Sequence, residues 1–143
     1  MMLTRRLLLS ALPILIPSRA FPHGYKRNTV EIVHPWTSDQ KEPSGDLIVG
    51  MTLKNASRME ELLVGATSSM ASKLELREEP GFRIITALPI PPNGSVELTR
   101  SGAHLRLLNL KKPLQTYDTI PVTLRFKRAG AVKVDVLVEE RLQ

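Results

Sequence analysis

Hydrophobic and polar residues alternate with a period of two along most of the chain after residue 20. This alternation predicts nine short strands, at residues 29–33, 46–53, 62–67, 73–77, 82–88, 95–99, 104–110, 119–127 and 131–139. Turn-forming runs such as Pro43-Ser44-Gly45 and Pro91-Pro92-Asn93-Gly94 lie between them. Because no segment has the pattern of an amphipathic helix, the sequence predicts an all-β, antiparallel sandwich of about eight to nine strands.

The last two predicted strands form the clearest hairpin. Residues 127–131 hold the turn signal Arg128-Ala129-Gly130. Side chains two residues apart share a strand face, and each strand has one apolar face. We therefore expect one side of each strand to face the core, formed by Val122, Leu124, Phe126, Val132, Val134, Val136 and Val138.

Residues 1–20 are predicted to be a signal peptide. Arg5 and Arg6 precede the apolar run 7–16, and Ser18 and Ala20 place small residues at positions −3 and −1 of a cleavage site. Ten helical residues rise about 15 Å, roughly half of a bilayer core, which predicts no stable membrane anchor. The pattern predicts a periplasmic protein, exported by the Sec route or, given the arginine pair, the twin-arginine route. Residues 21–143 then form one domain.

The charge of the chain suggests a protein that binds nucleic acid or an anionic membrane, but its distribution excludes nucleic-acid binding. The 143 residues include 20 Lys and Arg and 14 Asp and Glu, a formal net charge of +6. Arg5, Arg6 and Arg19 lie in the leader, so 17 basic and 14 acidic residues remain, a net charge of +3. The six aromatic residues do not alternate with Lys or Arg, as single-strand binding surfaces require.

Few residues offer catalytic chemistry, and we predict that the protein is not an enzyme. It contains no cysteine, which excludes a disulfide scaffold, a thiolate zinc site, a thiol nucleophile and a cysteine-linked lipid anchor. No serine lies in a G-x-S-x-G elbow, and no glycine-rich phosphate loop is present. The adjacent acids Glu78-Glu79 and Glu139-Glu140 point to opposite faces of a strand, which does not suit paired acid–base catalysis.

Segments spread in order over nearly all of residues 23–130 resemble the PCu(A)C-type periplasmic copper chaperones. The similar segments are residues 23–26, 30–36, 50–55, 61–68, 74–76, 90–92, 96–98, 101–114, 120–126 and 129–130, the longest reading SGAHLRLLNLKKPL. The resemblance implies a cupredoxin-like β-sandwich that binds Cu(I) with two histidines and two methionines. It also implies delivery of copper to a receiving periplasmic or membrane protein, such as a respiratory oxidase. Neutral imidazole and thioether ligands suit the soft Cu(I) ion.

Three of the four ligand positions implied by this resemblance are changed. Arg77 stands where the family has a histidine, and neither Phe82 nor Ile85 supplies the expected thioether. His-x-Met has become His104-Leu105-Arg106, so His104 is the retained ligand. A guanidinium about 5 Å from Cu(I) would oppose binding by roughly 3 kcal/mol at an effective dielectric constant of about 20. The resemblance therefore implies a degenerate member of the family, with Met51 as a weak further ligand candidate.

Two hypotheses remain open from the sequence. The first is a periplasmic Cu(I) carrier that uses His104. The second is an interaction module that has lost the metal and whose Arg77, Arg83 and Arg106 cluster to bind an anionic partner surface. His34 is expected to pack at the edge of the sandwich, and His23 lies near the predicted new N-terminus.

Overall fold

The described part of the chain consists of strands joined by turns. The computed structural model describes residues 24–39, 41, 45–81 and 83–140, and within these residues it contains no helix. The strands are β1 (Gly24–Arg27), β2 (Val30–Ser38), β3 (Leu47–Asn55), β4 (Glu61–Thr67), β5 (Ala71–Glu78), β6 (Arg83–Ile84), β7 (Leu88–Ile90), β8 (Gly94–Leu98), β9 (Ala103–Leu110), β10 (Thr119–Phe126) and β11 (Gly130–Glu139).

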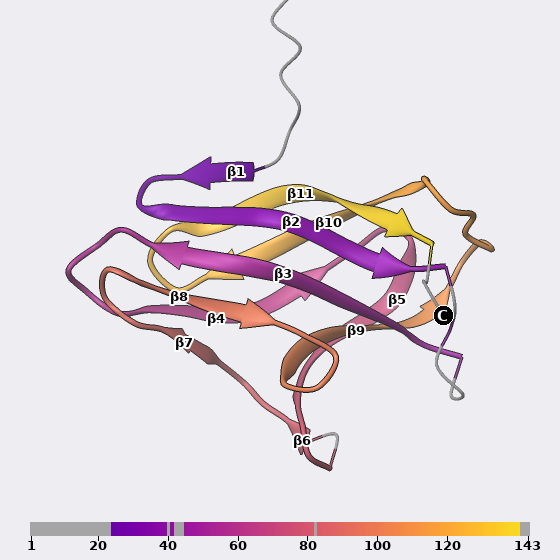
Figure 1. The fold of residues 1–143 in the computed structure, drawn as a ribbon, viewed down its shortest axis with the longest axis horizontal. Coiled ribbons are helices and arrows are strands. Elements are labelled where there is room, and N and C mark those ends of the chain that lie inside the picture. Colours follow the sequence, from indigo (N-terminus) through magenta and orange to yellow (C-terminus); the bar gives the residue numbers. More distant parts are fainter. Residues whose placement is uncertain (1–23, 40, 42–44, 82, 141–143) are drawn as a thin grey trace, which may run out of the picture.

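The strands form one continuous sheet that curls around the core (Figure 1). Its order is β6-β5-β9-β3-β2-β11-β10-β4-β7, with β1 paired to β2 and β8 paired to β3. Neighbouring strands are antiparallel, apart from β2 and β11, which run parallel where Trp36, Thr37 and Ser38 face residues 137–139. Because the sheet curls, β4 and β5 contact each other although they lie far apart in the strand order. The predicted all-β, cupredoxin-like sandwich is confirmed.

Two local predictions were wrong. Residues 82–88 were expected to be one strand, but this part of the chain contributes to two: β6 pairs with β5, and β7 pairs with β4. Between β6 and β7 the chain crosses from the side of β5 to the side of β4, which are distant in the sheet order. An apolar run in the sequence cannot reveal such a crossing. The strand β1 was not predicted, because its four residues GYKR show no alternation and the strand is defined by its pairing with β2.

The predicted C-terminal hairpin is confirmed. Val122 lies opposite Val134, Leu124 lies opposite Val132, and all seven predicted core side chains of β10 and β11 are buried. Gly130 begins β11 with a φ of 81°, a backbone conformation that glycine adopts without a Cβ clash. The hairpin therefore supplies one side of the hydrophobic core, as its pattern indicates.

Two buried polar side chains hold together the turns at one end of the sandwich. The carboxylate of Glu61 accepts hydrogen bonds from the backbone N–H groups of Arg128 (2.9 Å) and Ala129 (3.0 Å) in the β10–β11 turn. The side-chain amide of Asn55 donates to the carbonyl of Met59 (2.8 Å) in the β3–β4 loop. Both side chains are almost fully buried, so these bonds fix the positions of the turns.

The predicted signal peptide, residues 1–20, and His23 lie outside the described residues. Among the residues that the structure does describe, no helix has the length and apolar character needed to cross a membrane.

Candidate functional site

His104 and Arg106 lie on the same face of β9, because side chains two residues apart in a strand point the same way. The intervening Leu105 and the following Leu107 point to the other face and belong to the hydrophobic core. Neighbouring strands complete the face of His104: Arg77 of β5 lies opposite His104, and Glu75 of β5 lies opposite Arg106. We call this surface, made by His104, Arg106, Glu75 and Arg77, the His104 face.

The imidazole of His104 is fully buried and has one free nitrogen. Its exposed fraction is 0%, and its Nδ1 lies 3.1 Å from the carbonyl oxygen of Gly102. Because a carbonyl oxygen only accepts, Nδ1 carries the proton of the neutral ring. The other nitrogen, Nε2, has no hydrogen-bond partner in the described part of the chain. A lone pair thus remains available on Nε2, the arrangement in which histidine binds metals.

The surroundings of His104 keep its ring neutral. Burial lowers the pKa of His104 below the ordinary 6.5, the hydrogen bond to Gly102 partly opposes this, and the nearby Arg106 charge lowers the pKa further. The carboxylate of Glu79 acts in the opposite direction, and the charge of Arg77 adds to the lowering. Since a protonated ring cannot bind a metal through Nε2, this environment favours the ligand form at neutral pH.

This pKa shift predicts an acid-sensitive stability in the metal-free protein. As the pH falls below 6.5, His104 in the unfolded chain takes up a proton that the folded chain binds less readily, so the free energy of unfolding decreases. The decrease stops once the pH is below the folded pKa. Urea titrations between about pH 7.5 and pH 5, followed by the fluorescence of the single tryptophan, give the free energy of unfolding at each pH. Its decrease with falling pH should be smaller for H104N than for the wild type. Equal decreases in the two proteins would contradict a lowered pKa of His104 in the folded chain.

The arginines of the His104 face are matched by carboxylates. Arg77 donates from Nε to Glu75 Oε2 (2.8 Å) and from Nη2 to the same oxygen, while Lys73 Nζ lies 3.2 Å from Glu75 Oε1. Arg106 Nη1 lies 3.7 Å from Asp46 Oδ2, just before β3. The hydrogen bond from Arg77, together with Lys73, lowers the pKa of Glu75 against the opposing effect of burial. Glu75 is therefore ionised. The face carries two ion-paired groups, Lys73–Glu75–Arg77 and Arg106–Asp46, which together we call the ion-pair network.

The expected cluster of three free arginines is not present. Arg83 of β6 lies opposite Glu78, whereas Arg77 lies opposite Ile84, so Arg83 and Arg77 point to different faces. Arg83 forms an exposed ion pair with Glu78 (2.9 Å). Since Arg77 and Arg106 also have carboxylate partners, the hypothesis of a three-arginine anion site was wrong.

The methionines of the described strands and loops do not lie beside His104. Met51 is fully buried in the core, on the opposite face of β3 from Ile48, which pairs with Arg106. Met70 precedes β5, seven residues from Arg77, about 23 Å along an extended strand. Met59 lies in the exposed β3–β4 loop. His104 and Met51 are therefore not brought together, and no group of three or more His, Cys, Asp or Glu suitable for a metal was found among the described residues.

His34 was expected to pack at the edge of the sandwich, but it lies on β2, in the middle of the sheet order, with an exposed side chain. Its Nε2 lies 2.6 Å from Glu139 Oε1, which links β2 to β11. The residue is exposed and has a φ of 50°, at the irregularity between Val33 and Trp36 of β2. This partner makes His34 a structural residue.

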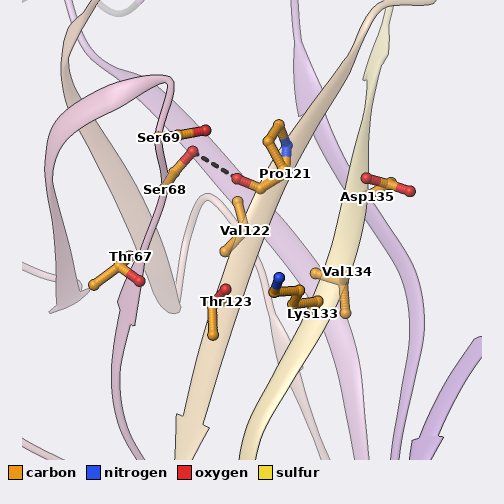
Figure 2. A pocket seen from close by; sticks show the side chains of 9 residues that line it. All are labelled: Thr67, Ser68, Ser69, Pro121, Val122, Thr123, Lys133, Val134 and Asp135. Atoms are coloured by element: carbon orange, nitrogen blue, oxygen red, sulfur yellow. Dashed lines mark hydrogen bonds between the residues drawn. The ribbon is translucent and has the colours of Figure 1, made fainter.

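A polar hollow lies elsewhere on the sheet, over β10 and β11 (Figure 2). Its volume is about 400 Å³, and hydroxyl groups of Thr67, Ser68 and Thr123 line it together with Lys133 and Asp135. Ser68 donates to the carbonyl of Pro121 (2.6 Å). None of the ligand residues predicted from the sequence contributes to this hollow.

Sequence reasoning missed the two carboxylates of the His104 face. Glu75 was detectable, because Lys73, Glu75 and Arg77 alternate along one strand and must share a face. Asp46 was not detectable, because its approach to Arg106 depends on the pairing of Ile48 with Arg106 between β3 and β9.

Comparisons with known proteins identify the family of the chain. The family model described as "Putative lipoprotein LpqE-like" matches residues 30–138. The "Putative lipoprotein Lxx21020" of Leifsonia xyli subsp. xyli is 30% identical over 138 residues, covering 87% of this chain and 78% of the relative. Both matches include β9 and the His104 face.

Solved structures with the same fold include PCuAC domains. The copper-bound PCuAC domain of PmoF2 has a TM-score of 0.75 at 24% identity, covering 83% of this chain and 99% of that domain. The Cu(I) form of DR1885 from Deinococcus radiodurans has a TM-score of 0.68 at 24% identity, covering 89% of this chain and 87% of that one. At this identity the likeness concerns the fold. The chain belongs to the LpqE-like family, and it has the fold of a PCuAC domain.

Proposed function

We propose that this protein is an exported copper-binding domain in which Nε2 of His104 is a ligand to Cu(I). The observation that carries the proposal is a buried, neutral imidazole whose Nδ1–H is fixed by a backbone carbonyl and whose Nε2 has no partner among the described residues. A histidine held in this way has its tautomer and ring orientation set before the metal arrives.

The ion pairs of the His104 face lower the electrostatic cost of placing a cation there. An isolated guanidinium would repel Cu(I), but Glu75 and Asp46 bring two negative charges close to Arg77 and Arg106. The described residues bring one neutral ligand to this face, which predicts weaker Cu(I) binding than two histidines and two methionines provide. Weak binding suits a carrier that must release its metal to a receiving protein, such as a respiratory oxidase.

The relatives support an extracytoplasmic location for this activity. The two structural neighbours reported above are described as copper-bound or Cu(I)-bound, and the family and its curated relative are described as lipoproteins. The predicted leader agrees with export by the Sec or twin-arginine route. The 143 residues contain no cysteine, so a lipoprotein-type thioether has no attachment site within this sequence.

Competition with a Cu(I) chelator tests the proposal. We expect the protein to take up one equivalent of Cu(I) from a weak chelator, and H104N to lose at least tenfold in affinity because the nitrogen ligand is removed. H34N is the matched control, since His34 already binds Glu139. Equal affinities for H104N and the wild type would contradict the proposal.

The second candidate is a family member that does not bind metal and serves as an interaction module. The ion-pair network of Arg77, Glu75, Arg106 and Asp46 favours it, because such a network can fill the face without copper. The same titration separates the two functions: absence of Cu(I) uptake under micromolar competition would favour the interaction module.

A further inference from the structure

The positive charge of the described chain is concentrated at one end of the sandwich. Eight exposed basic side chains belong to this region, which we call the basic end: Lys26, Arg27, Lys54, Arg58, Arg125, Lys127, Arg128 and Lys133. Four carboxylates accompany them, those of Glu31, Glu60, Glu61 and Asp135, the last in the same hollow as Lys133. The other described residues include eight Lys or Arg and nine Asp or Glu, so the net positive charge resides at the basic end.

The carboxylates of the basic end are partly engaged within the protein. Glu61 is buried and accepts the backbone bonds of the β10–β11 turn. Glu31 lies 4.0 Å from Lys26 and opposite Lys54 in the β2–β3 register. Glu60 is exposed beside Met59. The eight cations therefore outnumber the acids that a partner surface would meet.

The basic side chains are carried by turns that lie together. In Figure 1 the β1–β2, β3–β4, β7–β8 and β10–β11 connections occupy the same end of the molecule. Asn28, Met59 and Arg128 line one hollow of about 210 Å³. The β1–β2, β3–β4 and β10–β11 connections therefore lie side by side. A shallow hollow of about 690 Å³ brings Lys26, Arg27 and Lys133 together. The two hollows share Asn28, so the surfaces that they line adjoin each other at this end of the molecule.

An apolar side chain projects from this surface. Met59 is 58% exposed in the β3–β4 loop, directly after Arg58. The loop is fixed rather than free, because Asn55 binds the Met59 carbonyl and the backbone N–H of Met59 donates to the Ser57 hydroxyl (3.1 Å). A flexible apolar side chain among cations suits the boundary between lipid headgroups and acyl chains.

We propose that the basic end docks the protein onto an anionic phospholipid surface. Lys and Arg near such a surface each add to the attraction, and Met59 adds a contact with the acyl region. A membrane fits better than an acidic protein segment, because the charges are spread over several turns around an exposed apolar tip and not aligned along a deep groove. No residue of β5 or β9 belongs to the basic end, so this docking is independent of copper binding at His104.

Sedimentation of the full protein with lipid vesicles tests this inference. We expect binding to phosphatidylcholine vesicles that contain about 30 mol% phosphatidylglycerol, little binding to pure phosphatidylcholine, and release between about 0.05 M and 0.5 M NaCl because salt screens the charges. The triple variant R58Q/K127Q/R128Q should bind at least tenfold more weakly, and M59S should bind a few-fold more weakly with an unchanged salt dependence.

The matched control is K41Q/K111Q/K112Q, which removes three exposed charges outside the basic end and leaves the ion pairs of the His104 face intact. It should bind anionic vesicles like the wild type, and tryptophan fluorescence should show that all variants are folded. Equal loss in the two triple variants, or no preference for anionic vesicles, would overturn the proposal. Binding to poly-glutamate without binding to vesicles would also overturn it, in favour of an acidic protein partner.

Discussion

Replacing Glu75 with glutamine is expected to lower the free energy of unfolding by about 2 to 3 kcal/mol. The side chain of Glu75 is 9% exposed and accepts hydrogen bonds from Arg77, while Lys73 pairs with its other oxygen. Glutamine has nearly the same shape but no charge, so the partly buried guanidinium of Arg77 would lose its counter-ion. Urea titration followed by the fluorescence of the single tryptophan measures the change.

The control for this prediction is E78Q, three residues further along the same strand. Glu78 pairs with Arg83, but both side chains are exposed, so we expect a loss below about 0.5 kcal/mol. The pH adds a second readout. Because the pKa of Glu75 lies below its ordinary 4.5, the stability it provides is present above pH 4.5 and is lost as the pH falls through the folded pKa. An E75Q loss no larger than that of E78Q would refute the ion-pair network.

Replacing Arg106 with methionine is expected to raise the affinity for Cu(I) by roughly 100-fold. The change removes a guanidinium, worth roughly 3 kcal/mol of repulsion at 5 Å and an effective dielectric constant of 20, and adds a thioether. Residues 104 and 106 share a strand face with their Cα atoms about 7 Å apart, so imidazole and thioether can approach one ion. Chelator competition measures the affinity.

The variant R106L separates the two contributions. Leucine removes the same charge but offers no ligand, so R106L should gain less affinity than R106M. Both variants should lose stability, because Arg106 is 4% exposed and pairs with Asp46. Equal Cu(I) affinities for R106M and R106L would show that residue 106 does not reach the metal. If H104N/R106M bound Cu(I) as tightly as R106M, His104 would be excluded as a ligand.

Local alternation predicted most of the fold, because nearly all strands have one apolar face. The run Val132, Val134, Val136 and Val138 faces the core without ambiguity, and the turn at Gly130 fixes the hairpin. The alternation failed where a strand is defined by its pairing and not by its own sequence pattern. Strand β1 is defined by its pairing with β2. In the run from Arg83 to Ile90, β6 pairs with β5 and β7 pairs with β4.

The candidate site was predicted only in part for the same reason, because alternation within one strand shows which side chains share a face but not which neighbouring strands they meet. Alternation alone places His104 and Arg106 on one face and Leu105 on the other. It does not reveal that Asp46 reaches Arg106, that Arg77 lies opposite His104, or that Arg83 points away, since these depend on the registers of β3, β5 and β6 with their neighbours. The sequence therefore predicted the histidine correctly as a face residue but overestimated the free positive charge around it.

Whether Nε2 of His104 binds Cu(I) can be observed at the nitrogen itself by ¹⁵N NMR of the histidine side chains. In the metal-free protein, His104 should show a protonated Nδ1 and an unprotonated Nε2 near neutral pH. One equivalent of Cu(I), supplied under reducing and anaerobic conditions, should move the Nε2 resonance of His104 away from the unprotonated position and leave His34 unchanged. Retention of Cu(I) by the protein with an unmoved His104 Nε2 resonance would show that His104 is not a ligand.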